Sequence, residues 1–438
     1  MKQSLTSFLE LIHQPMKEEF LQHIWQASLY QNETLATTTG KSIQVIKPGT
    51  LNRDAGPDFF NSRIMVDGTL WAGNIEVHMH SSEWMQHGHQ FDASYNNVVL
   101  HVVYEHDAEI VNQMGKIIPT LELRSLISPA VISRYNNLYL GNKWIACENM
   151  LGDLDKQRTA SFVQRLYIER LEDKTRYIYQ DLHQNNKNWE QTFYEYLARN
   201  FGFKTNALPF HILAKNLPLQ VLAKHKNNLM QMEALLFGQA GFLHDNFEED
   251  YPVQLKKEYN YLKKAHQLEP VNRDLWKFAT MRPANFPTIR LAQFANLVHH
   301  SASLFSKCME VRSLKDLEKL FNIKLHDYWV THYQFDQTSV LSQKKLGKSS
   351  IENIFMNTMA PFMFAYGKEK FDNELCERSL QMMEDIPAEV NGITKNWNRL
   401  GFEISNAFQS QAFIQLKNMY CTPKKCLSCG IGNQILRP

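Results

Sequence analysis

The sequence predicts a mixed α/β domain followed by a mainly α-helical domain. Up to about residue 125, β-branched and apolar runs alternate with turn residues, whereas from about residue 155 apolar side chains recur at helical intervals. The 438 residues also exceed what one hydrophobic core usually organises. We therefore expect an α/β domain over residues 1–150, a helical domain over 151–418 and a cysteine-containing segment over 419–438.

The predicted elements of the first domain follow from local patterns. Apolar residues spaced at three and four positions predict a first helix over residues 17–31. Asp67-Gly68, flanked by strand-like runs, predicts a tight hairpin. A short helical or loop segment is expected around residues 94–96. Strands are predicted at residues 42–46, 63–66, 70–79, 98–104 and 120–123.

The helical domain is predicted from long amphipathic stretches such as residues 160–182 and 227–243. Two prolines within residues 282–290 (RPANFPTIR) interrupt this pattern and predict a structured turn that places Arg282 and Arg290. These arginines are expected either to contact phosphate or to cap and pair groups within the helical domain.

Composition limits the classes of protein that fit. A hydrophobic content of 44% with 12% aromatic residues excludes a mainly disordered chain. No apolar run approaches the roughly 18 residues of a membrane span, and the N-terminus lacks the features of a secretory signal, so we expect a cytoplasmic protein without a membrane partner. The net charge of +2 neither requires nor excludes a nucleic-acid partner.

Chemistry is concentrated between Gly56 and Asp107. This segment holds the carboxylates Asp58 and Glu76 and then five histidines: His78, His80, His87, His89 and His101. Glu76 and His78 are two residues apart in a predicted strand, so their side chains leave the same face of the sheet and can converge on one ion. The alternative is that the histidines cap loops and turns.

Pro57-Asp58 before a strand, followed by Glu76-Val77-His78 on the next strand, resembles the signature of the restriction-endonuclease-like PD-(D/E)XK phosphodiesterases. The resemblance implies that the first domain is a mixed sheet flanked by helices, with activity on nucleic acid, DNA or RNA. It implies Mg²⁺ or Mn²⁺ on Asp58, Glu76 and the Val77 carbonyl. The chain departs from the family in having His78 where members have lysine. A neutral imidazole there can act as a general base, and it shifts the ion preference toward Mn²⁺ or Zn²⁺.

Further residues are assigned from the same resemblance. His87, His89 and Asp92 occupy the place where members similar to very-short-patch repair nucleases carry a histidine and an aspartate, so they are expected to line the cleft as catalytic residues. Glu19 on the first helix is expected to add an acidic contact to the metal, the alternative being a favourable charge at the helix N-terminus. Substrate contacts are expected from four basic side chains: Arg282, Arg290, Lys424 and Lys425.

Two other resemblances keep alternatives open. His78-x-His80, with Glu83 after it and Gly73 before it, is similar to the first metal motif of cupins, although the spacing is too short; it implies a small-molecule metalloenzyme. The segment as a whole, together with the helical remainder and the cysteine-bearing end, resembles a group of bacterial proteins of unknown function. A non-catalytic nucleic-acid-binding or scaffold protein with the same fold is the remaining alternative.

Cysteines near the C-terminus indicate a second metal site. Cys421, Cys426 and Cys429 follow one another at short spacings, with Cys147 as the candidate fourth ligand. A zinc ion fits this set. An iron-sulfur cluster, found in some nucleases of the resembled superfamily, also fits, and a set of metal-free thiols is the plain alternative. Cys308 and Cys376 lie in helical patterns that predict buried thiols.

Overall fold

The computed structural model describes residues 16–33, 35–141, 143–279, 281–301 and 303–437. The chain divides into two compact units, one comprising residues up to Phe162 together with those from Leu416 onward, the other Val163–Gln415. The boundary lies inside helix α5 (Lys156–Gln184). The cysteine-containing segment thus belongs to the same unit as the sheet, and the helical unit lies between the two parts of that unit in the sequence.

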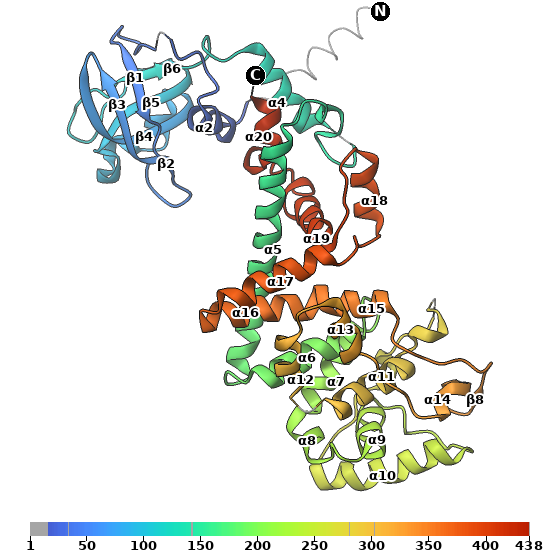
Figure 1. Ribbon diagram of the computed structural model, residues 1–438. Coiled ribbons are helices and arrows are strands. Elements are labelled where there is room, and N and C mark those ends of the chain that lie inside the picture. The colour runs from blue at the N-terminus through green and yellow to red at the C-terminus, as the bar shows by residue number, and fades with distance from the viewer. Residues whose placement is uncertain (1–15, 34, 142, 280, 302, 438) are drawn as a thin grey trace, which may run out of the picture. The chain divides into compact units, whose positions relative to one another are not determined.

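A mixed β-sheet forms the centre of the first unit (Figure 1). Its strand order is β1-β3-β4-β5-β6, with β2 paired to β3. The pairs β1–β3 and β3–β4 are antiparallel, whereas β4–β5 and β5–β6 are parallel. The strands are β1 (Ile43–Lys47), β2 (Thr50–Leu51), β3 (Phe59–Val66), β4 (Thr69–His80), β5 (Val98–Glu105) and β6 (Thr120–Glu122). The predicted α/β character of this part is confirmed.

Two connections in the sheet bear on function. Asp67 and Gly68 both have positive φ, 47° and 77°, which makes the short turn between β3 and β4 and places Val66 opposite Thr69. The parallel pairing of β4 with β5 requires the chain to cross over between them. This crossover contains α3 (Glu83–Gln86) and the 3₁₀ turns His89–Phe91 and Ala93–Tyr95. It carries His87 and His89.

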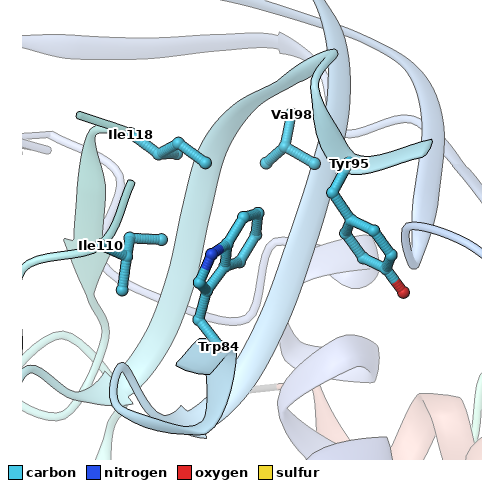
Figure 2. Packing of buried hydrophobic residues seen from close by; sticks show 5 residues of the cluster. All are labelled: Trp84, Tyr95, Val98, Ile110 and Ile118. Carbon is cyan, nitrogen blue, oxygen red and sulfur yellow. The ribbon is translucent and has the colours of Figure 1, made fainter. Parts of the chain in front are cut away.

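Trp84 anchors the crossover to the sheet. Figure 2 shows its indole ring among the side chains of Val98, Ile110 and Ile118, with Tyr95 alongside. Trp84 is fully buried, and its Nε1 donates a hydrogen bond to the Val111 carbonyl at 3.0 Å. Burial of a side chain this large stabilises the fold by roughly 3 kcal/mol. The residues that follow Trp84 are consequently held in place.

Three helices complete the first unit: α2 (Glu18–Ala27), α4 (Pro129–Leu140) and α20 (Gly430–Leu436). The predicted apolar face of α2 is buried, and the Phe20 ring stacks on Tyr135 of α4 at a centroid distance of 3.7 Å. The α20 helix contacts α4. The start of the expected helix, Lys17, is its N-cap, and the helix ends earlier than expected, at Ala27, because Ser28 adopts a left-handed conformation.

The second unit is mostly helical, as predicted, with one small hairpin of β7 (His332–Gln334) and β8 (Gln337–Thr338). Among the described residues, no helix has both the length and the apolar character needed to cross a bilayer. Besides the second part of α5, the helices are α6 (Trp189–Phe201), α7 (Ala207–Asn216), α8 (Leu219–Lys224), α9 (Leu229–Gln239), α10 (Asp250–His266), α11 (Pro287–His300), α12 (Leu304–Glu310), α13 (Leu314–Leu320), α14 (Tyr328–Thr331), α15 (Lys348–Ile354), α16 (Ala360–Lys370), α17 (Asn373–Asp385), α18 (Gly392–Arg399) and α19 (Ala407–Gln415).

Candidate metal centre

Three histidines converge at the end of strand β4. His78 points from the buried face of β4, and His87 and His89 follow α3 in the crossover. Gly88 between them has a φ of 75°, a left-handed conformation that glycine adopts without strain. The chain therefore turns back at Gly88. One ring nitrogen from each histidine lies within 4.8 Å of those of the other two, the closest grouping of its kind among the described residues.

The separations of the donor atoms fit a bound cation. His78 Nε2 lies 3.1 Å from His87 Nδ1. Glu76 Oε1 lies 3.5 Å from His78 Nε2 and 3.4 Å from His89 Nε2. Ligands bound at about 2.0–2.1 Å around one tetrahedral ion would be roughly 3.3 Å apart. The buried His89 Nε2 makes no hydrogen bond within the chain and faces Glu76 Oε1.

Glu76 and Asp58 form a buried acidic pair beside the histidines. The Asp58 backbone N–H donates to Glu76 Oε2 at 3.0 Å, and Asp58 Oδ2 accepts from the Val77 N–H at 3.0 Å. Burial, and then the charge of Asp58, raise the pKa of Glu76 to about 9. Burial raises the pKa of Asp58 to about 6, opposed by its hydrogen bonds from Val77 and Gln22. A cation would favour the ionised form of both groups.

The buried histidines are held in the neutral form that binds metals. Burial, reinforced by the neighbouring imidazoles, lowers the pKa of His78 to about 3 and that of His89 to about 4. His101 on β5 is fully buried, and its Nε2 lies 2.8 Å from His78 Nδ1. His78 Nδ1 is thereby engaged, so its Nε2 faces the other ligands. His101 is in the position of an outer partner that orients a ligating imidazole.

The acidic residue of α2 at the site is Glu18, whereas we expected Glu19. Glu19 is exposed, and Glu18 is half-buried. Gln22, one turn along the same helical face, donates to Glu18 Oε1 at 3.2 Å and to Asp58 Oδ1 at 2.9 Å. Burial and then the Asp58 charge raise the pKa of Glu18 to about 7. Which of the two adjacent glutamates reaches the site depends on which face of α2 turns toward the sheet.

Other predicted residues lie outside the convergence. Asp92 is exposed and caps the following 3₁₀ turn by accepting from the Ser94 N–H at 2.8 Å. His80 is exposed at the end of β4 and does not join the three histidines. Glu83 accepts hydrogen bonds from the backbone N–H groups of Met79 and His80. The cupin motif predicted that Glu83 and His80 bind one metal ion. In the structure, the Glu83 carboxylate instead accepts hydrogen bonds from the backbone of β4.

The basic residues proposed for substrate binding are in different environments. Arg290 is 5% exposed; its guanidinium donates to Asn285 at 2.6 Å and Gln293 at 2.9 Å and stacks over Phe203. It therefore holds the helical unit together, as the alternative interpretation expected, and is not presented to a ligand. Arg282 is exposed. Lys424 and Lys425 are exposed as well, and Lys424 Nζ donates to the Tyr139 carbonyl at 3.0 Å.

Four residues of the site were not assigned a role from the sequence. Glu18 and Gln22 are separated by four positions, a spacing that could have indicated their common face. His101 could have been found from the parallel pairing of β4 and β5, which places it opposite Glu76. Tyr95, on which the His89 ring stacks at 3.8 Å, lies in the crossover, where no periodic pattern indicates orientation.

The four cysteines proposed as a second site lie together in the first unit. Cys147, Cys421, Cys426 and Cys429 line one small cavity. The remaining two are in the helical unit; Cys308 is buried and Cys376 is half-buried.

Comparison with known families places the chain. A family model described as "Protein of unknown function (DUF2851)" matches residues 18–392. The chain belongs to this family. The match includes Glu18, the three histidines and Cys147 but ends before the last three cysteines, so the candidate metal centre lies wholly within the family region. No curated protein and no solved structure matches the chain. The resemblance to PD-(D/E)XK enzymes stays a prediction.

Proposed function

We propose that the chain is a metal-dependent phosphodiesterase acting on nucleic acid, with its ion bound by His78, His87 and His89. The observation that carries the proposal is the set of donor separations of 3.1, 3.4 and 3.5 Å among these histidines and Glu76. Imidazole nitrogens with one carboxylate oxygen favour a transition metal over Mg²⁺. The sequence suggested Mg²⁺ or Mn²⁺; with these ligands we expect the enzyme to be active with Mn²⁺.

The number of protein ligands on the ion decides whether water and substrate can also bind to it. His78, His87, His89 and Glu76 would hold the ion. Zn²⁺ in structural sites is usually closed by four protein ligands, whereas Mn²⁺ accepts more ligands and would leave room for water and substrate. The ion would supply Lewis acidity and lower the pKa of the water. Asp58, in contact with Glu76 through its backbone N–H, would orient that carboxylate.

Two features support a phosphodiester substrate. Asp58 precedes β3, Glu76 lies on β4, and a parallel strand follows, which is compatible with the strand order implied by the phosphodiesterase resemblance. The helical unit also carries a basic hollow of about 570 Å³. Four lysines line it together with Glu318 and apolar side chains, and Lys348 pairs with Glu318 at 3.6 Å, which leaves a positive excess that suits a phosphate backbone: Lys315, Lys319, Lys345 and Lys348.

Cleavage assays with matched variants test the proposal. Labelled single- and double-stranded DNA and RNA would be incubated with metal-stripped protein plus Mn²⁺, Mg²⁺ or Zn²⁺. We expect cleavage with Mn²⁺, little with Mg²⁺ and inhibition by Zn²⁺. His87→Ala should abolish cleavage, whereas His80→Ala, another exposed histidine at the same strand end, should retain it. Cleavage that survives His87→Ala would remove the histidine centre from the mechanism.

Binding is tested separately from cleavage. The double variant Lys315→Glu/Lys319→Glu should weaken DNA or RNA binding and reduce its dependence on salt concentration, because each lost phosphate contact lowers the salt slope by nearly one. Salt-sensitive binding without cleavage in any metal would favour the non-catalytic nucleic-acid-binding alternative.

The histidine centre itself favours a second candidate, a metalloenzyme acting on a small molecule. Three imidazoles around one ion suit Zn²⁺ or Fe²⁺ chemistry on a small substrate as well as they suit hydrolysis. In that case, metal would bind with one ion per chain and be lost in His87→Ala, and no nucleic acid would bind or be cut. Calorimetric titration of metal beside the nuclease assay separates the two candidates.

A further inference from the structure

We propose that the four-cysteine cluster, Cys147, Cys421, Cys426 and Cys429, binds one Zn²⁺ ion as a structural site that holds the C-terminal helix in place. This inference concerns a part of the molecule separate from the histidines and does not depend on the proposed function. The argument rests on the convergence of the thiols, the size of the space between them, the charges around them and the helix that they flank.

The thiols come from four short pieces of backbone. Cys147 precedes the 3₁₀ turn Glu148–Met150, and Cys421 ends a π-helical turn (Leu416–Cys421). Cys426 begins the 3₁₀ turn Cys426–Ser428, and Cys429 is the N-cap residue of α20. All four line the same cavity although Cys147 is separated from the others by the whole helical unit in the sequence. The tertiary fold, rather than local sequence, brings this ligand set together.

The space between the thiols suits a single ion. The cavity measures about 10 Å³, which is about the volume one water-sized probe occupies. An iron-sulfur cluster, with several irons and inorganic sulfides, needs far more room. Among the described residues only the three histidines form a trio with ligand atoms all within 4.8 Å of one another, so in any three of the cysteines at least one sulfur–sulfur separation exceeds the roughly 3.8 Å of a zinc tetrathiolate. Zinc must therefore draw the thiols inward by side-chain rotation.

Two basic side chains lie beside the cavity, Lys417 near Cys421 and Lys424 near Cys426. Zinc binds cysteine in the thiolate form, so a zinc tetrathiolate would carry a charge of −2. These lysines would offset that charge.

The backbone around the cavity is tightly turned. A Cβ on Gly432 would lie 2.1 Å from the Cys426 carbonyl oxygen, and a Cβ on Gly430 would lie 2.6 Å from the Phe162 ring. Lys424 has a φ of 54° in the turn between Cys421 and Cys426. A side chain at either glycine would force the turn open. The segment is thus folded around the thiols with little freedom to rearrange.

The helix that follows needs an anchor. The α20 helix has only seven residues, too few for a helix to be stable alone in water. Its polar tethers are the hydrogen bonds of Gln434 to the Asp155 N–H at 2.9 Å and to Thr159 at 3.3 Å, and of Arg134 to the Ile435 carbonyl at 3.4 Å. Zinc joining Cys429, at the start of α20, to Cys147 would link the C-terminal segment to the first part of the chain.

The test measures metal content in the full-length chain. The His87→Ala background removes a ligand of the histidine centre, so zinc counted by mass spectrometry reports the cysteines. We expect about one zinc per chain, lost in Cys147→Ser and in Cys426→Ser but retained in Cys376→Ser, the matched control in the helical unit. Iron with acid-labile sulfide and visible absorption, or zinc retained by both cysteine variants, would overturn the proposal.

A second measurement covers the case in which the variants do not fold. Titration of folded wild-type protein with an organomercurial should release the zinc stoichiometrically, as read by a colorimetric chelator. Hydrogen exchange over residues 420–437 should then accelerate at least tenfold. Unchanged exchange after complete release of the zinc would refute the anchoring role.

Discussion

Replacing Glu76 by glutamine should stabilise the metal-free protein and at the same time weaken its response to metal. Burial and the Asp58 charge raise the pKa of Glu76 to about 9, against 4.5 for the exposed group. Folding therefore favours the protonated form of Glu76, so the contribution of this group to stability is fully present below pH 4.5 and is lost as the pH rises toward 9. Each pH unit in this window costs about 1.36 kcal/mol, which amounts to about 4 kcal/mol between pH 5 and pH 8.

A neutral amide does not carry this cost. Urea denaturation of EDTA-treated protein, followed by fluorescence of Trp84 and the other tryptophans, should show Glu76→Gln to be more stable than the wild type at pH 8 and similar to it at pH 5. Added Mn²⁺ should stabilise the wild type at pH 8 more than the variant, which keeps the three histidines but lacks the carboxylate. Asp92→Asn, at an exposed carboxylate outside the convergence, is the control. A variant less stable than the wild type at pH 8, with an undiminished Mn²⁺ response, would refute the reasoning.

Three further perturbations follow from the structure. His101→Gln should lower metal affinity about 10–100-fold although His78, His87 and His89 are intact, because it removes the group that orients His78. Calorimetric titration with Mn²⁺ measures the affinity. An unchanged affinity would show that His101 does not orient His78. Gly88→Ala should destabilise the first unit by about 1–2 kcal/mol and weaken metal binding, since alanine resists the left-handed turn; equal thermal stability and equal affinity would contradict this. Arg290→Met should lower the stability of the helical unit by about 2–4 kcal/mol, because it leaves the polar partners of the guanidinium unsatisfied. It should not change the dependence of nucleic-acid binding on salt concentration; a changed dependence would show that Arg290 contacts the substrate.

Local sequence patterns predicted much of the architecture. The alternation of apolar residues around Asp67-Gly68 indicated the hairpin that forms β3 and β4, and helical spacing indicated the apolar face of α2. The change of period near residue 155 indicated the helical part, although the division lies at Phe162, inside a continuous helix. Such features were accessible because hydrogen bonding and side-chain spacing within one element decide them.

Side-chain partners across elements were less accessible. Period-two spacing put Glu76 and His78 on one face of a strand, but which of Glu18 and Glu19 faces them depends on how α2 packs. Asp92 and His89 are three residues apart, yet Asp92 caps a turn in solvent and His89 joins His78 and His87. Loop geometry, set by the burial of Trp84 and the left-handed Gly88, makes that difference.

The sequence by itself determined the main strands of the first part, the helical character of the second, the residue types available for metal binding and the family to which the chain belongs. The tertiary structure decided which side chains from different elements meet. It brought His101 against His78 through the parallel pairing of two strands, and Cys147 against Cys429 across a long sequence separation. Such contacts depend on the packing of segments that are far apart in the sequence, and local sequence patterns do not specify that packing.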